Sequence, residues 1–588
     1  MSAHVRVPAA ALLTRGCALA LISALLVAGC GTSTGKIAGR SGGTVTVLEV
    51  NGGVDSLDPG FWYYQTDYTD LAQTTQRWLY GWRARSLTPV PDLATAMPAL
   101  SDGGRTLTIH IRSGIHYSPP LAARTVSSAD IKYAIERCFL ASVGNGYAFD
   151  YYGEIEGAPH EPVSHLVNIP GIRAPNATTL VIHTSVPVGV LDDADALALP
   201  CTAPVPQSYA ERFDRGAQST YGEHQLFTGP YMIAGAGSGT VPHSSYAPGR
   251  LLALERNRSW RRESDPIRSA YFNAIIFRGG YSKTVASREV LEGTSLMSGD
   301  FTAPPPAILA EALSSRRSQL YITPAQATRY ISLNTRVKPL DNVDVRRAIG
   351  AVIDRSALLR LIGGPTLGAI ATHFLAPEMP GFNVAGGYRG PGYDFLSHPE
   401  GDLALAQHYM RLAGYRRGRY EGPPLSAVAA DEAPQKNVAE AIQSQLAQIG
   451  INLELHEVPH TTMLTKYCTV PKAHIAICPN LSWGKDFFDS QSMIAPIFDG
   501  NLIQEQANTD TSLADNPAYN AQIEAAKEVI GERARAQAWG RLDRELTAEA
   551  YVIPWLWENQ VSFASANVKG VPWAFNGGAW DLTASSLK

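Results

Sequence analysis

Residues 425–457 constrain the fold more than any other part of the sequence. LSAVAA is an apolar strand, PQKNVAEAIQSQLAQIG is an amphipathic helix, and INLELHEV is a second strand. The helix carries aliphatic residues along one stripe and ends before a C-cap glycine; these are Val438, Ile442, Leu446, Ile449 and Gly450. Strands joined this tightly through one helix are parallel. We therefore expect an α/β lobe that binds ligands at the carboxyl ends of its strands.

Further elements follow from the same periodicities. Alternating, β-branched runs predict strands at 44–50, 251–257 and 273–278, and a strand followed by a turn within 105–118. Ser127 is placed to cap a helix over 127–139. The apolar spacing over 341–362 predicts one further helix, which Gly363 and Gly364 end.

The N-terminus predicts export. Residues 17–29, CALALISALLVAG, form an uncharged apolar run that is shorter than a typical membrane-spanning helix. The run ends in LVAGC, which resembles the lipobox of bacterial lipoproteins, so residues 1–29 are the expected signal peptide and Cys30 the lipidated residue. The alternative is a signal peptide cut nearby, with Cys30 incidental. Residues 30–43 are rich in Gly, Ser and Thr and are predicted to be a flexible tether.

Composition excludes some functions. The net charge of −4 and the 17% of charged residues show no excess of positive charge of the kind that binds nucleic acid. No other run reaches membrane-spanning length, so we expect a mature protein held only by its lipid. Four cysteines remain in an exported chain, which favours disulfides over buried free thiols. Their connectivity does not follow from the sequence; our guess is Cys138–Cys201 and Cys468–Cys478.

Several motifs occur in the order seen in extracytoplasmic solute-binding proteins of ABC importers, in the oligopeptide/dipeptide class (family 5). They are VDSLDP (54–59), PDLATAMPALSDGGRTLTIHIRSGIHYS (91–118), SSADIKYAIER (127–137), FTGPYMI (227–233), LLALERNRSW (251–260), YISLNTRVKPLDNVDVRRAIGAVIDRSAL (330–358) and KNVAEAIQSQLAQIGINLEL (436–455). The resemblance covers nearly all of the mature chain. It departs at PPLAARTV (119–126), which replaces the family's Asp-Gly-Thr-Pro and puts local loop contacts in doubt.

The resemblance implies an α/β, periplasmic-binding-protein-like type II fold. It is a two-lobed clamshell with an extra domain on the first lobe, and the lobes close by a hinge motion. The implied boundaries are 44–62, 201–330 and 556–588 for lobe I, 63–200 for the extra domain and 331–555 for lobe II. The implied function is capture of a short peptide at the extracytoplasmic face of the membrane, by a monomer that delivers it to a permease driven by a separate ATPase.

Candidate ligand residues come from the same resemblance. Peptide-binding members carry a Trp-x-x-Asp pattern whose Asp pairs with the ligand's α-ammonium, and Trp483-Gly484-Lys485-Asp486 matches it. Asp486 is thus the expected amine anchor and Trp483 an apolar wall. Of Phe487 and Phe488, one is expected in the core and one in the cleft, and Phe487 is the candidate ligand contact. The alternative is that Asp486 hydrogen-bonds an ordinary surface loop.

The residues beside Asp486, and a segment after the first strand, have expected roles of their own. We expect Lys485 to be a solvated lysine; the alternatives are a pair with Asp489 and a contact with a ligand carboxylate. Asp489 is expected to cap the following turn or helix. Val54, Asp55 and Ser56 resemble the family's main-chain contact segment, where a peptide is bound as an added strand; an ordinary strand-end turn is the alternative.

The alternative functions differ in the ligand or in the chemistry. A ligand other than a peptide is possible on this scaffold, such as a metal complex, a sugar or haem, and so is a role as a peptide-signal receptor. A lipid-anchored hydrolase is a remote alternative, because the sequence contains no Gly-x-Ser-x-Gly, no His-Glu-x-x-His and no Cys/His zinc spacing. We accordingly expect no catalytic residues, no metal and no cofactor.

Overall fold

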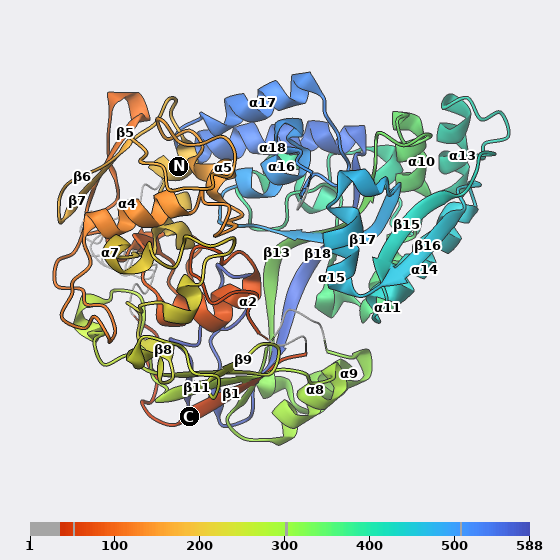
Figure 1. The fold of residues 1–588 in the computed structure, drawn as a ribbon. Helices are drawn as coiled ribbons and strands as arrows, with labels where there is room; N and C mark the ends of the chain where they lie inside the picture. Colours follow the sequence, from red (N-terminus) through yellow and green to blue (C-terminus); the bar gives the residue numbers. More distant parts are fainter. Residues whose placement is uncertain (1–35, 51–52, 300–303, 506–507) are drawn as a thin grey trace, which may run out of the picture. The chain divides into compact units, whose positions relative to one another are not determined.

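Two mixed six-stranded sheets and a smaller antiparallel sheet organise the chain (Figure 1). The computed structural model describes residues 36–50, 53–299, 304–505 and 508–588. The predicted signal peptide and Cys30 therefore lie outside the described residues. Within the described ranges, no helix combines the length and the apolar character that a membrane crossing requires.

The first sheet has the strand order β12-β1-β11-β10-β8, with β9 added at β10. Its strands are β1 Thr44–Leu48, β8 Tyr231–Ile233, β9 Tyr246–Ala247, β10 Leu251–Arg256, β11 Ala274–Arg278 and β12 Leu296–Ser298. The associated helices are α8 Lys283–Glu292 and α9 Pro306–Ser315, whereas α7 Gln207–Ala210 places Ala210 in a small cluster with Tyr133 and Ala134. Gly42 and Gly43, inside the predicted tether, already make backbone hydrogen bonds with Tyr271 and Asn273, so ordered packing begins before Thr44.

The third, four-stranded sheet has the order β4-β5-β7-β6. Its strands are β4 Ala99–Ser101, β5 Thr106–His110, β6 Ile172–Asn176 and β7 Thr179–His183. Nearby elements are α2 Gln65–Asp67, a π-helix at Tyr68–Ala72, α3 Gln73–Thr75, β2 Tyr80–Gly81, β3 Val90–Pro91, α4 Ser128–Arg137, α5 Ala148–Tyr152 and α6 Gly189–Asp192. Ser127 caps α4 in a capping box with Asp130, which confirms the predicted helix start.

The second sheet has the order β14-β18-β13-β17-β15-β16. Its strands are β13 Leu320–Leu333, β14 Gly368–Ile370, β15 Leu425–Ala430, β16 Leu453–Val458, β17 Ile477–Gly484 and β18 Val552–Phe563. Its helices are α10 Val343–Val352, α11 Arg355–Ile362, α12 Phe382–Ala385, α13 Leu403–Leu412, α14 Gln435–Ala447, α15 His460–Thr462, α16 Gln491–Phe498, α17 Pro517–Lys527 and α18 Glu532–Glu549. The predicted strand–helix–strand unit is confirmed: β15 and β16 are parallel, and the aliphatic stripe of α14 is buried.

Two long strands connect the first sheet with the second. β13 and β18 pair antiparallel from Leu320 and Phe563 to Ser332 and Val552, with register shifts near Pro324 and Arg329 (Figure 1). The C-terminal segment after β18 then contributes β19 Val568–Lys569 and β20 Ser586–Leu587. The chain thus runs between the two sheets along a pair of neighbouring strands.

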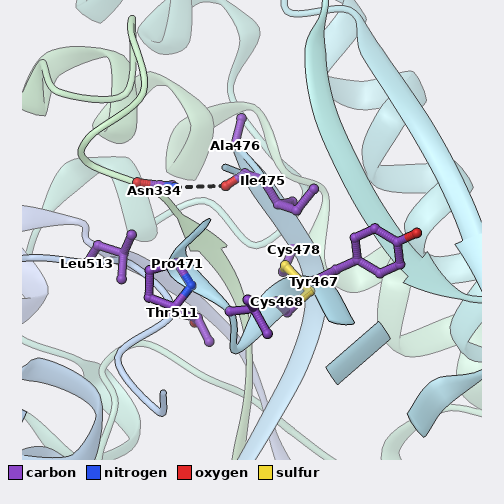
Figure 2. Close-up of a pocket in the computed structure, with 10 residues that line it drawn as sticks. Asn334, Tyr467, Cys468, Pro471, Ile475, Ala476, Cys478, Thr511 and Leu513 are labelled. Carbon is purple, nitrogen blue, oxygen red and sulfur yellow. Dashed lines mark hydrogen bonds between the residues drawn. A yellow bond between two sulfur atoms is a disulfide. The ribbon is translucent and has the colours of Figure 1, made fainter. Parts of the chain in front are cut away.

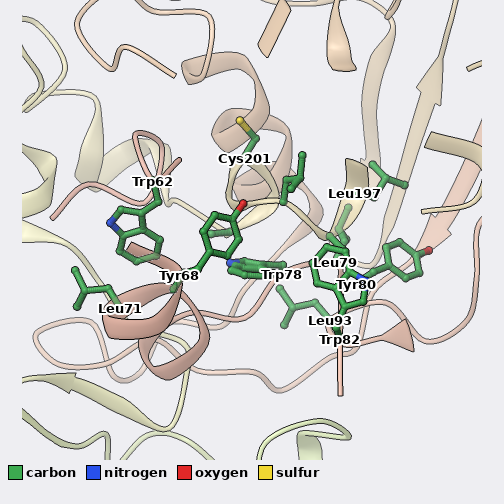
Figure 3. Close-up of a cluster of buried hydrophobic side chains, with 14 of the residues drawn as sticks. Trp62, Tyr68, Leu71, Trp78, Leu79, Tyr80, Trp82, Leu93, Leu197 and Cys201 are labelled. Carbon is green, nitrogen blue, oxygen red and sulfur yellow. The ribbon is translucent and has the colours of Figure 1, made fainter. Parts of the chain in front are cut away.

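The first and third sheets share one hydrophobic core. Buried aromatic residues fill its centre, among them Trp62, Tyr68, Trp78 and Trp82 (Figure 3). The C-terminal segment adds Phe575, which stacks on Trp82 with ring centroids 3.5 Å apart. Separate cores cover the two faces of the second sheet.

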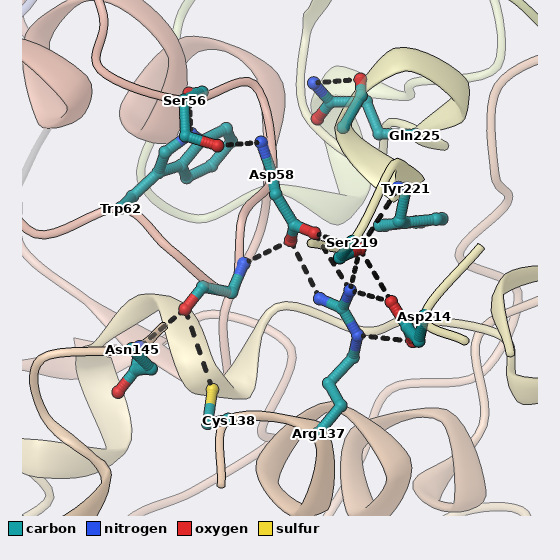
Figure 4. A network of polar contacts seen from close by, with 12 residues as sticks. Ser56, Asp58, Trp62, Arg137, Cys138, Asn145, Asp214, Ser219, Tyr221 and Gln225 are labelled. Carbon is teal, nitrogen blue, oxygen red and sulfur yellow. Dashed lines mark hydrogen bonds and ion pairs between the residues drawn. The ribbon is translucent and has the colours of Figure 1, made fainter. Parts of the chain in front are cut away.

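Buried ion pairs hold the third-sheet region against the first-sheet region. Arg137 of α4 donates to both carboxylate oxygens of Asp58 at 2.8 and 2.9 Å and to Asp214 at 2.6 and 3.1 Å (Figure 4). Ser219 donates to both carboxylates as well. The Arg137 side chain is fully buried, and its single charge has two carboxylate partners. A second fully buried group joins the same regions through Arg77, Asp92, Asp265 and Arg268.

Two disulfides are present, between Cys138 and Cys201 and between Cys468 and Cys478. The predicted single helix over 341–362 is wrong, because α10 ends at Val352 and α11 begins at Arg355. Asp354 accounts for the break, since its carboxylate accepts the Ala357 N–H at 2.7 Å as an N-cap.

Candidate functional site

The loop between β17 and α16 carries the candidate amine anchor. β17 ends at Gly484 and runs parallel to β15, so this loop leaves the same edge of the second sheet as the segments after β15 and β16. Trp483 folds back on the loop, because its indole N–H donates to the Ser492 carbonyl of α16 at 2.9 Å. This contact fixes the direction in which the next residues leave the strand.

Asp486 reaches across the fold to the third-sheet region. The Tyr151 hydroxyl of α5 donates to its carboxylate at 2.5 Å, a contact between residues 335 positions apart. The adjacent Phe487 is completely buried in the core of the first and third sheets and packs edge-on against the Tyr151 ring. In these contacts Asp486 and Phe487 differ from residues of an ordinary surface loop.

Four tyrosines surround the Asp486 carboxylate. Tyr68 donates to the Tyr147 hydroxyl at 3.1 Å, and Tyr147 donates to the Tyr63 carbonyl at 3.1 Å. Burial raises the pKa of Tyr63, Tyr68, Tyr147 and Tyr151 well above the usual range, and the Asp486 charge raises each of them further. Asp486 therefore lies among neutral rings and hydroxyls.

The electrostatics at Asp486 favour a cation as its partner. Burial raises the pKa of the Asp486 carboxyl to about 7; the Tyr151 hydrogen bond lowers it, Asp150 raises it, and the charge of Lys485, which makes no hydrogen bond to it, lowers it. Asp486 and Tyr63 nevertheless keep some solvent exposure although they lie deep in the protein. A carboxylate in such a place is stabilised by an opposite charge within hydrogen-bonding distance. Aromatic faces around a carboxylate also suit an ammonium group.

Lys485 is buried, so the prediction of a solvated lysine is wrong. Only 8% of the residue is exposed, and its ammonium donates to the Phe575 carbonyl at 2.5 Å and to the Gln326 side chain at 3.0 Å. Gln326 in turn donates to Glu378 at 2.7 Å. Burial lowers the pKa of Lys485 to about 7. Lys485 thus connects the Asp486 loop to the C-terminal segment, which folds back from the end of the chain.

Asp489 has a structural role. Its carboxylate accepts the Gln491 N–H at 2.8 Å at the start of α16, as expected for a cap. Its second partner, which no sequence pattern predicted, is Arg535 of α18; this residue donates to both carboxylate oxygens at 2.7 and 2.8 Å. The two carboxylates of the loop therefore differ: Asp489 is paired inside the second-sheet region, and Asp486 faces the third-sheet region.

Val54, Asp55 and Ser56 lie in a different neighbourhood. The Asp55 N–H donates to Asp67 at 3.0 Å, and the Ser56 carbonyl accepts the Trp62 indole N–H at 2.9 Å. Val54 is buried and lines a small pocket beside β9 and β10. Through α2, this segment connects to Tyr63 and Tyr68 but makes no recorded contact with Asp486 in the described part of the chain.

A second pocket lies away from the Asp486 loop. It has an empty volume of about 280 Å³, open solvent included, and it is lined by Asn334, Tyr467, Pro471 and the Cys468–Cys478 disulfide among others (Figure 2). Asn334 donates to the Ile475 carbonyl there at 2.9 Å. Across the described ranges, no cluster of three or more His, Cys, Asp or Glu residues is arranged to hold a metal ion.

Comparison with known proteins identifies relatives over most of the chain. The family model described as bacterial extracellular solute-binding proteins, family 5 Middle, matches residues 88–504. The oligopeptide-binding protein OppA of Bacillus subtilis (strain 168) is 21% identical over 484 residues, which is 80% of each chain.

Solved structures share the fold. The clavulanic acid biosynthesis oligopeptide binding protein 2 superposes with a TM-score of 0.79 and 26% identity over 94% of this chain and 96% of its own. The Helicobacter pylori protein DppA, in complex with the peptide STSA, superposes with a TM-score of 0.73 and 18% identity over 93% and 98%. The fold is that of type II periplasmic binding proteins, which confirms the expected α/β architecture of two lobes with an extra domain on the first.

Proposed function

Because the chain belongs to the bacterial extracellular solute-binding proteins of family 5, we propose that it captures a short peptide between its two lobes for an ABC importer. The observation that supports the proposal is the Asp486 carboxylate of the proposed lobe II, which faces the proposed extra domain, retains some exposure and has four tyrosines near it. The relatives OppA and DppA, named for oligopeptide binding and solved with a bound peptide respectively, support the ligand class.

In this proposal, Asp486 binds the α-ammonium of the peptide. That cation is present in every peptide with a free N-terminus, so the contact gives affinity without side-chain specificity. A charge-assisted pair removed from water is strong, and the loss of one partner costs about 2–5 kcal/mol. Trp483 and Phe487 hold the loop through α16 and the first core, and Val54–Ser56 are proposed to meet the peptide main chain.

The proposed lobes follow the boundaries given above. Lobe I comprises 44–62, 201–330 and 556–588, the extra domain 63–200, and lobe II 331–555. The first sheet falls in lobe I and the third sheet in the extra domain. The second sheet falls in lobe II, except for the parts of β13 before residue 331 and of β18 after residue 555. The boundaries near 330 and 555 fall on β13 and β18, where paired strands can bend as a hinge.

Delivery and anchoring complete the proposal. The protein is held at the outer face of the membrane by a lipid on Cys30, acts as a monomer, and passes its peptide to a permease driven by an ATPase. Replacement of Cys30 by alanine should release the protein into the medium. Membrane retention of the Cys30→Ala protein would count against the anchor.

Peptide binding is testable with a library of synthetic tri- to pentapeptides. We expect the protein to retain free peptides in native mass spectrometry and to reject the same peptides after N-acetylation, which removes the ammonium. Asp486→Asn should lose the thermal stabilisation that peptides confer and keep the melting temperature of the ligand-free protein.

The matched control is Asp431→Asn, an exposed carboxylate at the end of β15, which should bind like the wild type. Equal binding of free and acetylated peptides would remove Asp486 from the site. Chemical conversion of the peptides would overturn the binding function in favour of a hydrolase.

A further inference from the structure

An acidic segment of the extra domain faces lobe II at a distance from Asp486. It comprises α6 and the residues after it, with Asp192, Asp193 and Asp195. The approach is close, because a Cβ on Gly189 would lie 2.0 Å from the Arg535 guanidinium and 2.6 Å from the Val529 carbonyl. This contact is separate from the proposed amine site and from the ion pairs that join the extra domain to lobe I.

Arg535 is the cation at this contact, and its donors are used within lobe II. It donates to both oxygens of Asp489, to the Gln491 side chain at 2.9 Å, and to the carbonyls of Lys527 and Val529 at 3.2 and 2.8 Å. These bonds occupy the Nε and both terminal nitrogens. The guanidinium therefore offers the acidic segment little beyond its charge, which Asp489 already balances.

The carboxylates of the extra domain are left without donors. Among the residues that the structure describes, neither Asp192 oxygen nor Asp195 Oδ1 has a hydrogen-bond partner. The two residues are 5% and 7% exposed. The charged groups facing them are Asp193, Asp489, Glu532 and Arg535, so carboxylates outnumber the single guanidinium. An ionised carboxylate buried without a partner is costly, whereas the protonated acid is not.

The direction of the proton exchange follows from burial. Burial raises the pKa of Asp192 to about 7 and that of Asp195 well above its usual range, and Asp193 and Asp489 add to these shifts. In an open protein these residues would face water, where an aspartate pKa is about 4. At a pH between the open-state and the closed-state pKa, closure is accompanied by proton binding. The closed state is therefore fully stable below the open-state pKa, and it loses stability as the pH rises toward the closed-state pKa.

We propose that closure of lobe II onto the extra domain takes up protons at Asp192 and Asp195, so that a rise in pH opens the protein. This inference rests on the proposed two-lobed closure but not on the identity of the ligand. Acidic surroundings then favour the closed, ligand-holding state, and the same contact opposes closure of the empty protein at alkaline pH.

The test is small-angle X-ray scattering of the ligand-free protein at constant ionic strength from pH 5 to pH 8. We expect the radius of gyration of the wild type to increase with pH. The double variant Asp192→Asn/Asp195→Asn should stay compact, with a ratio of closed to open protein at pH 8 at least tenfold above that of the wild type. The control Asp102→Asn changes an exposed aspartate of the same domain and should behave like the wild type.

Two outcomes would overturn the proposal: a radius of gyration that does not change with pH in the wild type, or an unchanged pH response in the double variant. If the double variant does not fold, each single variant should show a smaller change in the same direction. Asp486 is also expected to bind a proton on closure. The same variants made in a protein that carries Asp486→Asn separate this contribution to the pH response from that of Asp192 and Asp195.

Peptide binding at pH 6, measured on the same samples with the synthetic library, separates the two hypotheses. If peptides bind but the radius of gyration does not change with pH, only the proposed proton uptake is wrong. If the radius of gyration changes with pH but no peptide binds, only the proposed peptide function is wrong.

Discussion

The extra domain has two interfaces, and they treat buried charge in opposite ways. Toward lobe I, Arg137 is fully buried between Asp58 and Asp214 and every polar atom of its group has a partner. In the second buried group at this interface, all four charges are paired, and Arg268 Nη2 alone has no hydrogen-bond partner among the described residues. Toward lobe II, Asp486 has a tyrosine hydroxyl, and the buried oxygens of Asp192 lack any partner among the described residues. The first interface suits permanent attachment, and the second suits a contact that is made only under certain conditions.

Two of the buried cations show a similar difference: Arg137 lies at the lobe I interface of the extra domain, and Lys485 lies between lobe II and lobe I. Burial alone would lower the pKa of Arg137, but the two carboxylates beside it raise the pKa well above its usual range. Lys485 has only carbonyl and amide oxygens within hydrogen-bonding distance, and burial lowers its pKa to about 7. A compensated charge stabilises its interface at any physiological pH, whereas an uncompensated one makes the interface depend on pH.

The largest expected effect comes from breaking the permanent interface. Arg137→Met removes the cation and leaves Asp58 and Asp214 buried together without it. We expect the free energy of unfolding to fall by about 3–5 kcal/mol or the extra domain to detach. Urea unfolding at pH 7, followed by tryptophan fluorescence, measures the change.

The matched control for that variant is Arg105→Ala, which breaks an exposed ion pair with Asp102 in the same domain. Such pairs contribute about 0–1 kcal/mol. Similar losses in the two variants would show that the buried network adds nothing beyond a surface pair, and the contrast between the interfaces would collapse.

A smaller effect is expected at Lys485, with a characteristic pH dependence. Its pKa of about 7 in the folded protein lies below the usual value of about 10.4, so the unfolded chain binds the extra proton between these values. The stability of the wild type relative to Lys485→Met should therefore rise with pH by about 1.4 kcal/mol per unit above pH 7. Urea unfolding at pH 7.5 and 9 measures this slope.

The exposed Lys472, in a surface pair with Glu505, provides the control. Lys472→Met should show no such slope. A flat difference between Lys485→Met and the wild type would mean that Lys485 titrates as an exposed lysine and is not held between the lobes.

Local pattern sufficed for much of the fold. The aliphatic stripe over 438–449 and the alternation of its flanking strands predicted β15, α14 and β16, because burial of one face sets the period of each element. The break at Asp354 was missed although an N-cap residue was visible in the sequence, since the apolar spacing continues across it.

The site was less accessible to prediction. The Trp-x-x-Asp spacing selected Asp486, but nothing in the sequence connects residue 486 with Tyr151, 335 positions away. The expectation for Lys485 failed for the same reason, because its burial depends on Phe575 near the end of the chain. Contacts between distant segments follow from how the lobes pack, which no local periodicity encodes.

The smallest expected effect tests the hydrogen bond between the extra domain and Asp486. Tyr151→Phe removes a donor that lowers the pKa of Asp486, so this pKa should rise further above 7. A peptide ammonium pairs with the ionised carboxylate, and binding should therefore weaken more at pH 6 than at pH 8, by about 1 kcal/mol at pH 6. Calorimetry with one tripeptide retained from the library measures the affinity at both values.

Tyr152→Phe is the matched control for this last change. The Tyr152 hydroxyl donates to the Ala196 carbonyl at 2.6 Å and not to Asp486, so its loss removes one hydrogen bond of the same domain and leaves the pH profile of binding unchanged. If both variants shift the profile equally, the effect belongs to α5 as a whole. If only Tyr151→Phe shifts it, the Tyr151 hydroxyl sets the pH at which Asp486 pairs with the ammonium, a role that no group at the lobe I interface is expected to have.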